Sequence, residues 1–94
     1  MIQEYSVDNG YYVIYTEDLS QREITAFLAV RPETHQDSLN TLLNEIAEKH
    51  NHQFVFRFSD NGIAIVVKSL DFPNVQNIIA DITSQFSSAG YHQS

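Results

Sequence analysis

The stretch His50–Lys68, HNHQFVFRFSDNGIAIVVK, decides the fold of this chain. Apolar residues alternate with other residues on both sides of a central Asp-Asn-Gly, which is the pattern of a β-hairpin. We expect Asn61-Gly62 to be the two-residue loop, which would pair Phe58 with Ile65. One face of this hairpin is wholly apolar: Phe54, Phe56, Phe58, Ile65 and Val67. Burial of each such side chain is worth about 1.5–3 kcal/mol, so this face should join the core.

Three further strands are expected before this hairpin. Residues 2–7 alternate loosely and lead into another Asp-Asn-Gly turn at residues 8–10, where Asn9 and Gly10 tolerate the positive φ of a type I′ turn. Residues 11–16 (YYVIYT) are rich in aromatic and β-branched side chains, which favour a strand. Residues 24–30 (ITAFLAV) are apolar on both alternating faces, which indicates a central strand.

Two amphipathic helices complete the expected elements. The first should begin near His35, because Thr34 and Asp37 have capping-box spacing, and should stop at Asn51. Its apolar stripe consists of Leu39, Leu42, Leu43, Ile46 and Ala47. Pro73 suits the first turn of the second helix. The stripe of that helix consists of Val75, Ile78, Ile79, Ile82 and Phe86.

The order β-β-β-α-β-β-α predicts an α+β fold. Short connections and right-handed crossovers leave few arrangements, and the simplest is a ferredoxin-like two-layer sandwich. We expect a five-stranded, mostly antiparallel sheet of order 1-2-3-5-4, with the third and fifth strands parallel at its centre and both helices on one face. Residues 1–88 should form the single domain, and residues 89–94 a frayed tail.

The composition narrows the function classes. The chain has 94 residues with twelve acidic and five basic side chains, a net charge of −7 and no cysteine. The scattered Lys and Arg residues argue against nucleic acid and anionic membranes as partners, because both need clustered cations. Because the chain has no cysteine, disulfide bonds and thiolate chemistry are excluded. The N-terminus has no signal-peptide pattern and no stretch reaches membrane-spanning length, so we expect a cytoplasmic protein.

The helix-free face of the sheet is the candidate functional surface. We expect the hairpin to contribute Val55, Arg57, Val66 and Lys68 to it, and the central strand to contribute Phe27. The second strand is expected to add Tyr11, Val13 and Tyr15. Pairing through Asn9-Gly10 would put Val7 and Tyr5 with Tyr12 and Ile14 on the helix side. Such an aromatic and aliphatic patch is typical of a partner-binding surface. The alternative is that β-branched residues stand there through strand propensity alone.

Catalytic and metal chemistry have weak signals in the sequence. His50 and His52 could share an ion, but no third ligand is placed by spacing, so exposed loop histidines are the favoured interpretation. No serine lies in a nucleophile-elbow pattern, and the isolated glycines form no phosphate-binding loop. Glu17 and Asp18 lie in a polar loop, where carboxylates usually serve solvation. We therefore expect no catalytic residue, no metal and no cofactor.

The element order and the segment from residue 56 to residue 88 (FRFSDNGIAIVVKSLDFPNVQNIIADITSQFSS) resemble the core of the type III secretion chaperones. The resemblance implies binding of polypeptide segments and dimerisation, and it assigns no residue here. In that family a leading helix precedes the three strands, and this chain lacks it.

The sequence favours a small acidic, non-enzymatic protein–protein interaction module: an adaptor, an inhibitor or a chaperone-like protein. Its partner would be another protein or a second copy of the chain. Two alternatives stay open. One is a regulatory domain that binds a small molecule or a metal. The other is a DNA-mimic or immunity-type inhibitor that binds a basic partner.

Overall fold

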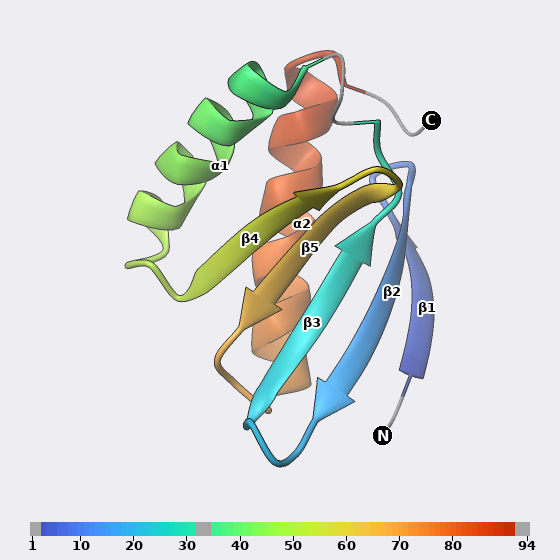
Figure 1. Ribbon diagram of the computed structural model, residues 1–94, viewed down its shortest axis with the longest axis vertical. Coiled ribbons are helices and arrows are strands. Elements are labelled where there is room, and N and C mark those ends of the chain that lie inside the picture. Colours follow the sequence, from blue (N-terminus) through green and yellow to red (C-terminus); the bar gives the residue numbers. More distant parts are fainter. Residues whose placement is uncertain (1–2, 32–34, 92–94) are drawn as a thin grey trace.

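The computed structural model describes residues 3–31 and 35–91. It has seven elements: β1 (Gln3–Asp8), β2 (Tyr11–Asp18), β3 (Glu23–Leu28), α1 (Gln36–Lys49), β4 (Phe54–Ser59), β5 (Gly62–Val67) and α2 (Phe72–Ser88). The strands form one sheet of order β1-β2-β3-β5-β4 (Figure 1). The α+β class, the order of the elements and the order of the strands are as the sequence predicts.

The direction of β5 differs from the expectation. β3 and β5 pair antiparallel, as do all the other neighbouring strands of the described sheet, so the predicted parallel centre is wrong. The reason lies in the connections. The crossover through α1 makes β4 run in the direction of β3, and the tight β4–β5 hairpin then reverses the chain, so that β5 enters between them antiparallel to both.

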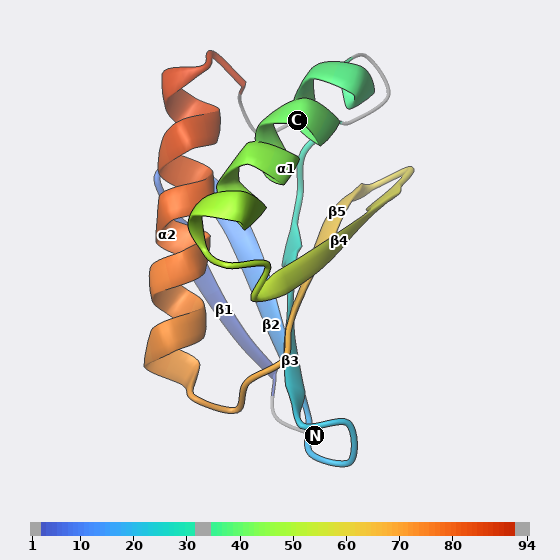
Figure 2. The same cartoon turned by 90° about the vertical axis from the view of Figure 1, so that its left-hand side faces the viewer.

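The two helices lie on the same side of the sheet, and the core lies between them and the strands (Figure 2). α1 contacts β4, and α2 contacts β1 and β3. The α2 stripe from Val75 to Phe86 is buried, and so are Leu39, Leu43, Ile46 and Ala47 of α1, while Leu42 is half-buried. From the hairpin, Phe54, Ile65 and Val67 are buried, and Phe56 and Phe58 pack against the core at its edge.

The helix boundaries follow local signals. His35 is the N-cap of α1, and Asn51 and His52 adopt left-handed φ values of 56° and 55° directly after the helix, which ends it where Asn51 predicts. Thr34 lies outside the described residues. Pro73 occupies the first turn of α2, where its missing N–H would have no partner in any case.

The β1–β2 turn is the predicted two-residue loop and is bound to α2. Asn9 and Gly10 have φ values of 51° and 88°, as a type I′ turn requires. The Asn9 side-chain amide donates to the backbone oxygen of Ala80 at 3.2 Å and to Thr83 Oγ1 at 3.0 Å. The Thr83 hydroxyl in turn donates to the Ile79 carbonyl. The turn residue that sets the hairpin therefore also fixes it to the helix.

The β4–β5 turn differs from the predicted loop. Ser59 pairs with Gly62, so Asp60-Asn61 is the loop, and Phe58 lies opposite Ile63 instead of Ile65. The pairing shifts by two residues, which leaves every side chain on the face that the sequence predicts. Gly62 is the first residue of β5, at a position where a Cβ would lie 2.1 Å from the carbonyl oxygen of Leu28, so glycine alone fits there.

Tyr91, in the predicted tail, packs against the core. Its ring contacts Phe86 at a centroid distance of 6.3 Å, and its carbonyl accepts a hydrogen bond from the Tyr11 hydroxyl. Residues 92–94 lie outside the described residues. Neither helix has the length and apolar character that crossing a bilayer demands, within the part of the chain that the structure describes.

Candidate functional site: the open sheet face

The structure places one strand of the predicted surface on the opposite side. Tyr11, Val13 and Tyr15 are 1%, 1% and 2% exposed, so the expectation that they lie on the helix-free face is wrong. Directly opposed residues in a sheet share a face, and Val13 lies opposite Leu28 while Tyr15 lies opposite Ala26, both of which point into the core. β3 therefore sets the orientation of β2.

The even-numbered residues of β2 take their place. Tyr12 and Ile14 lie on the helix-free face, and they bring Val7 and Tyr5 of β1 with them as paired neighbours. Tyr5 is 72% exposed, Val7 61% and Tyr12 60%. The predicted pairing of these four residues is correct, but the predicted side is wrong.

The other predicted residues lie on the helix-free face as expected. Phe27 and Val66 are half-buried there, Val55 is 62% exposed, and Arg57 and Lys68 are exposed. One lateral row across all five strands runs through Tyr5, Ile14, Phe27, Ala64 and Arg57. We call the whole surface the open sheet face, and it comprises Tyr5, Val7, Tyr12, Ile14, Phe27, Val55, Arg57, Ala64, Val66 and Lys68.

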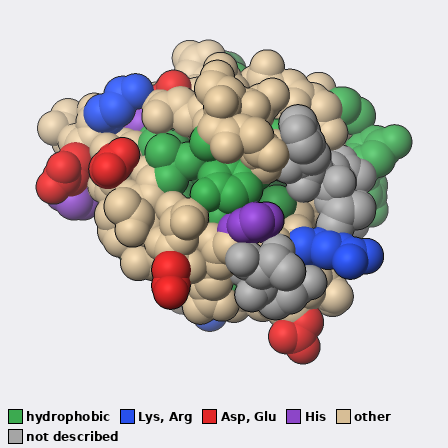
Figure 3. All heavy atoms as spheres, turned by 90° about the horizontal axis from the view of Figure 1, so that it is seen from above, with side chains coloured by type: hydrophobic (Ala, Val, Ile, Leu, Met, Phe, Trp, Pro, Cys, Tyr) green, Lys and Arg blue, Asp and Glu red, His purple; other side chains and the backbone are tan. Residues whose placement is uncertain are grey.

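The charges of this face lie at its margins. Lys68 Nζ is 2.5 Å from Glu23 Oε2, so its charge is locally compensated. Arg57 lies on the edge strand β4. Figure 3 shows one end of the molecule, where the Lys and Arg side chains are separated from one another. Hydrophobic side chains cluster there at the rim on the side where Figure 1 has β1 and β2.

Behind β1, toward the helices, lies a polar cluster instead of an apolar layer. The Tyr15 hydroxyl donates to Asp8 Oδ2 at 3.2 Å, and Ser6 Oγ donates to the same oxygen at 3.4 Å. The Tyr15 ring meets Phe72 edge to face at a centroid distance of 5.0 Å. Burial, and after it the charge of Asp8, raises the pKa of the Tyr15 phenol.

This raised pKa predicts a loss of stability at alkaline pH. A tyrosine in the unfolded chain releases its proton near pH ~10, whereas folded Tyr15 retains it. The stabilisation is therefore present below about pH 10 and is lost above it, by up to about 1.4 kcal/mol per pH unit. We expect urea denaturation at several pH values to show a shallower alkaline decline for Tyr15→Phe than for the wild type. Equal slopes would contradict the assignment.

His50 lies on the helix side of the sheet, away from the open sheet face. His50 Nε2 is 2.8 Å from Asp81 Oδ2, so it joins the end of α1 to α2. Burial alone would raise the pKa of Asp81, but hydrogen bonds from His50 and Gln85 outweigh it and hold that pKa below its usual value. His52 is exposed. Among the described residues, no group of three or more His, Asp or Glu side chains is placed to hold a metal ion.

No protein-family model, curated protein or solved structure matches the chain. The comparisons therefore lend no support to the resemblance with type III secretion chaperones.

Proposed function

We propose that this chain is a small acidic, non-enzymatic protein–protein interaction module that acts through the open sheet face. One observation carries the proposal. Among the described residues, five large hydrophobic side chains are exposed, and four of them (Tyr5, Val7, Tyr12 and Val55) lie on this face. Exposed apolar side chains gathered on one face are typical of a binding site, and tyrosine combines a large rigid apolar ring with a hydrogen-bonding tip.

The orientation of β1 supports the proposal. An edge strand of a two-layer fold normally turns its apolar side chains toward the helices. β1 does the reverse: Tyr5 and Val7 point away from the helices, whereas Ser6 and Asp8 point toward them. A departure from hydrophobic-in patterning is expected where a surface has a function.

The charge distribution favours a protein as the partner. Phosphate backbones and anionic lipids require several cations facing them, and the open sheet face has Arg57 at one edge and Lys68 compensated by Glu23. A second copy of the chain is the first partner to test, since sheets pack well face to face at a separation of about 10 Å.

We also propose that the fold is a ferredoxin-like two-layer sandwich. The position of α1 and α2 on the same side of the sheet in Figure 2 supports this description.

Matched lysine substitutions test the proposal. Tyr12→Lys places a charge on the open sheet face, whereas Leu19→Lys places it in the β2–β3 turn, at a side chain that is 64% exposed and outside the face. We expect sedimentation velocity and affinity capture with the purified chain to show self-association or a retained protein. Binding should weaken at least about tenfold in Tyr12→Lys and stay unchanged in Leu19→Lys.

Two outcomes would count against the open sheet face. The first is a wild-type chain that stays monomeric at high concentration and retains no protein. The second is an equal loss of binding in Tyr12→Lys and Leu19→Lys, which would mean that net charge rather than the face governs association. Circular dichroism of each variant shows whether the fold is intact.

A further inference from the structure

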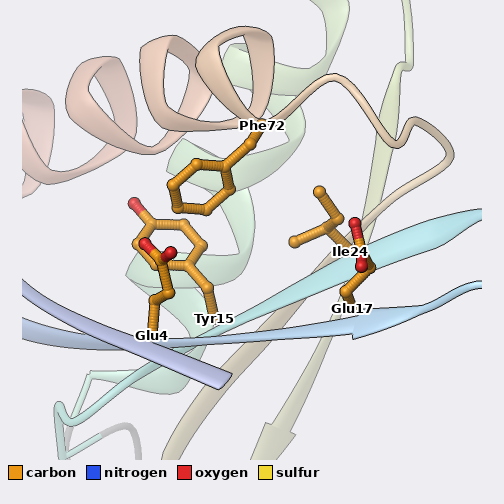
Figure 4. A pocket seen from close by; sticks show the side chains of 5 residues that line it. All are labelled: Glu4, Tyr15, Glu17, Ile24 and Phe72. Atoms are coloured by element: carbon orange, nitrogen blue, oxygen red, sulfur yellow. The ribbon is translucent and has the colours of Figure 1, made fainter. Parts of the chain in front are cut away.

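A small pocket lies on the helix side of the sheet, behind the open sheet face. It has a volume of ≈ 140 Å³ and is lined by Glu4, Tyr15, Glu17, Ile24 and Phe72. These residues come from β1, β2, β3 and the first residue of α2. In Figure 4, Glu4 and Tyr15 rise from neighbouring strands beneath Phe72, and Ile24 and Glu17 stand across the gap from them. The volume admits a chain of a few non-hydrogen atoms.

The floor of the pocket is apolar and held in place. Ile24 and Tyr15 are buried, and Phe72 packs against the core. The Tyr15 ring is fixed at both ends, by its strand and by the hydrogen bond from its hydroxyl to Asp8. Its edge-to-face contact with Phe72, at an interplanar angle of 82°, keeps both rings in position. The cavity is therefore formed before any ligand enters.

The mouth of the pocket is negative. Glu4 is exposed and Glu17 half-buried, and the pocket lining contains no Lys, Arg or His. Over residues 3–31 and 35–91, neither carboxylate takes part in an ion pair. The third carboxylate nearby, Asp8, already accepts hydrogen bonds from Tyr15 and Ser6. Two charged acceptors thus face an apolar cavity and have no cationic partner on this part of the chain.

We propose that this pocket binds a primary alkylammonium group. Its methylene chain would lie against Ile24, Tyr15 and Phe72, and its ammonium would donate hydrogen bonds to the carboxylates of Glu4 and Glu17. An ammonium is compact and carries three donors, so it can serve two separate carboxylates, whereas the planar guanidinium of arginine needs a wider slot. The aromatic rings beside the carboxylates add cation–π attraction. The inference is independent of the proposed function of the open sheet face.

Butylammonium and its neutral isostere 1-butanol test the chemistry. In amide-resolved NMR titrations of the full chain, butylammonium should perturb residues around Tyr15 and Phe72. It should bind at least about tenfold more tightly than 1-butanol, because the isostere fills the apolar floor but lacks the charge. Equal affinities of the two probes, or perturbation confined to other surfaces, would overturn the proposal.

A matched pair of double variants excludes a general effect of the net charge of −7. Glu4→Gln with Glu17→Gln removes both carboxylates of the pocket and keeps its shape. Glu45→Gln with Glu48→Gln removes two exposed carboxylates from α1, far from the pocket lining. We expect butylammonium to bind the first variant about five- to twentyfold more weakly than the wild type and the second with unchanged affinity. Equal losses in the two variants would overturn the proposal.

Two sources could supply this group, and two probes distinguish them. Nα-acetyl-lysine amide represents a lysine side chain of a protein, and 1,5-diaminopentane represents a free amine. If both bind with the same dependence on Glu4 and Glu17, a lysine of a partner protein is a suitable ligand. If only the diamine does, the ligand is a free amine. Failure of both probes would overturn the proposal and leave the test of the open sheet face unaffected.

Discussion

Val13→Lys is expected to destabilise the protein strongly. Val13 is 1% exposed on the helix side of β2, and an ammonium there would lose its hydration without gaining a partner. The cost of a buried, unpaired charge is several kcal/mol. A chain of 94 residues has a total stability of about 5–14 kcal/mol, so we expect a loss of at least ~4 kcal/mol, measured by urea denaturation followed by circular dichroism.

Val7→Lys is the matched control for this substitution. Both positions are valines on neighbouring strands, but Val7 is 61% exposed on the open sheet face. The lysine there stays in water, so the free energy of unfolding should change by less than about 1 kcal/mol. The opposite result, with a large loss of stability in Val7→Lys and a small one in Val13→Lys, would restore the orientation of β2 that the sequence predicts.

Sequence periodicity is sufficient to predict which face of each helix and of the β4–β5 hairpin is buried. The α2 stripe from Val75 to Phe86 has one unambiguous apolar face, and it is buried as predicted. The hairpin has an equally clear apolar face, which is why Val55 and Val66 of the candidate site were predicted on the correct side. In these segments one alternation is strongly apolar and the other is mixed, so burial leaves a single choice.

The orientation of β2 was not predictable in the same way. Its odd set, Tyr11, Val13 and Tyr15, and its even set, Tyr12, Ile14 and Thr16, are almost equally apolar, so burial of either set satisfies the local pattern. The pairing of β2 with β1 is then the remaining sequence signal. The apolar Tyr5 and Val7 of β1 favour burial of the even set, which is the wrong side. The missing signal is the nonlocal register of β2 against β3, together with the hydrogen bonds that let Asp8 and Ser6 face the helices.

The role of Gly62 is also nonlocal. In the sequence, Asn61-Gly62 matches the preferred residues of a two-residue hairpin loop. In the structure, Gly62 is the first residue of β5 and lies against the end of β3. Gly62 could lie in the loop or at the start of β5, and the close approach of the Leu28 carbonyl favours the strand position. Leu28 lies far earlier in the chain, so the local turn sequence contains no information about this contact.

Gly62→Ala is therefore expected to cost far more than a surface substitution. The added Cβ would lie 2.1 Å from the Leu28 carbonyl oxygen and 2.9 Å from Cζ of Phe27. The Phe27 ring can move, but the backbone oxygen belongs to the β3–β5 ladder and can move only if the strands separate. We expect a loss of about 3 kcal/mol or more in the free energy of unfolding, because overpacking against backbone exceeds the usual cost of an extra methyl group.

Gly10→Ala separates this contact from the conformational preference of glycine. Gly10 has a φ of 88°, and a Cβ added to it would meet no heavy atom within 4 Å, so its substitution introduces backbone strain without a steric clash. We expect a cost of about 1–2 kcal/mol there. A smaller effect at Gly62 than at Gly10 would mean that β5 does not approach β3 as closely as the structure places it. In that case the two halves of the open sheet face would not join as one continuous surface across Phe27 and Ala64.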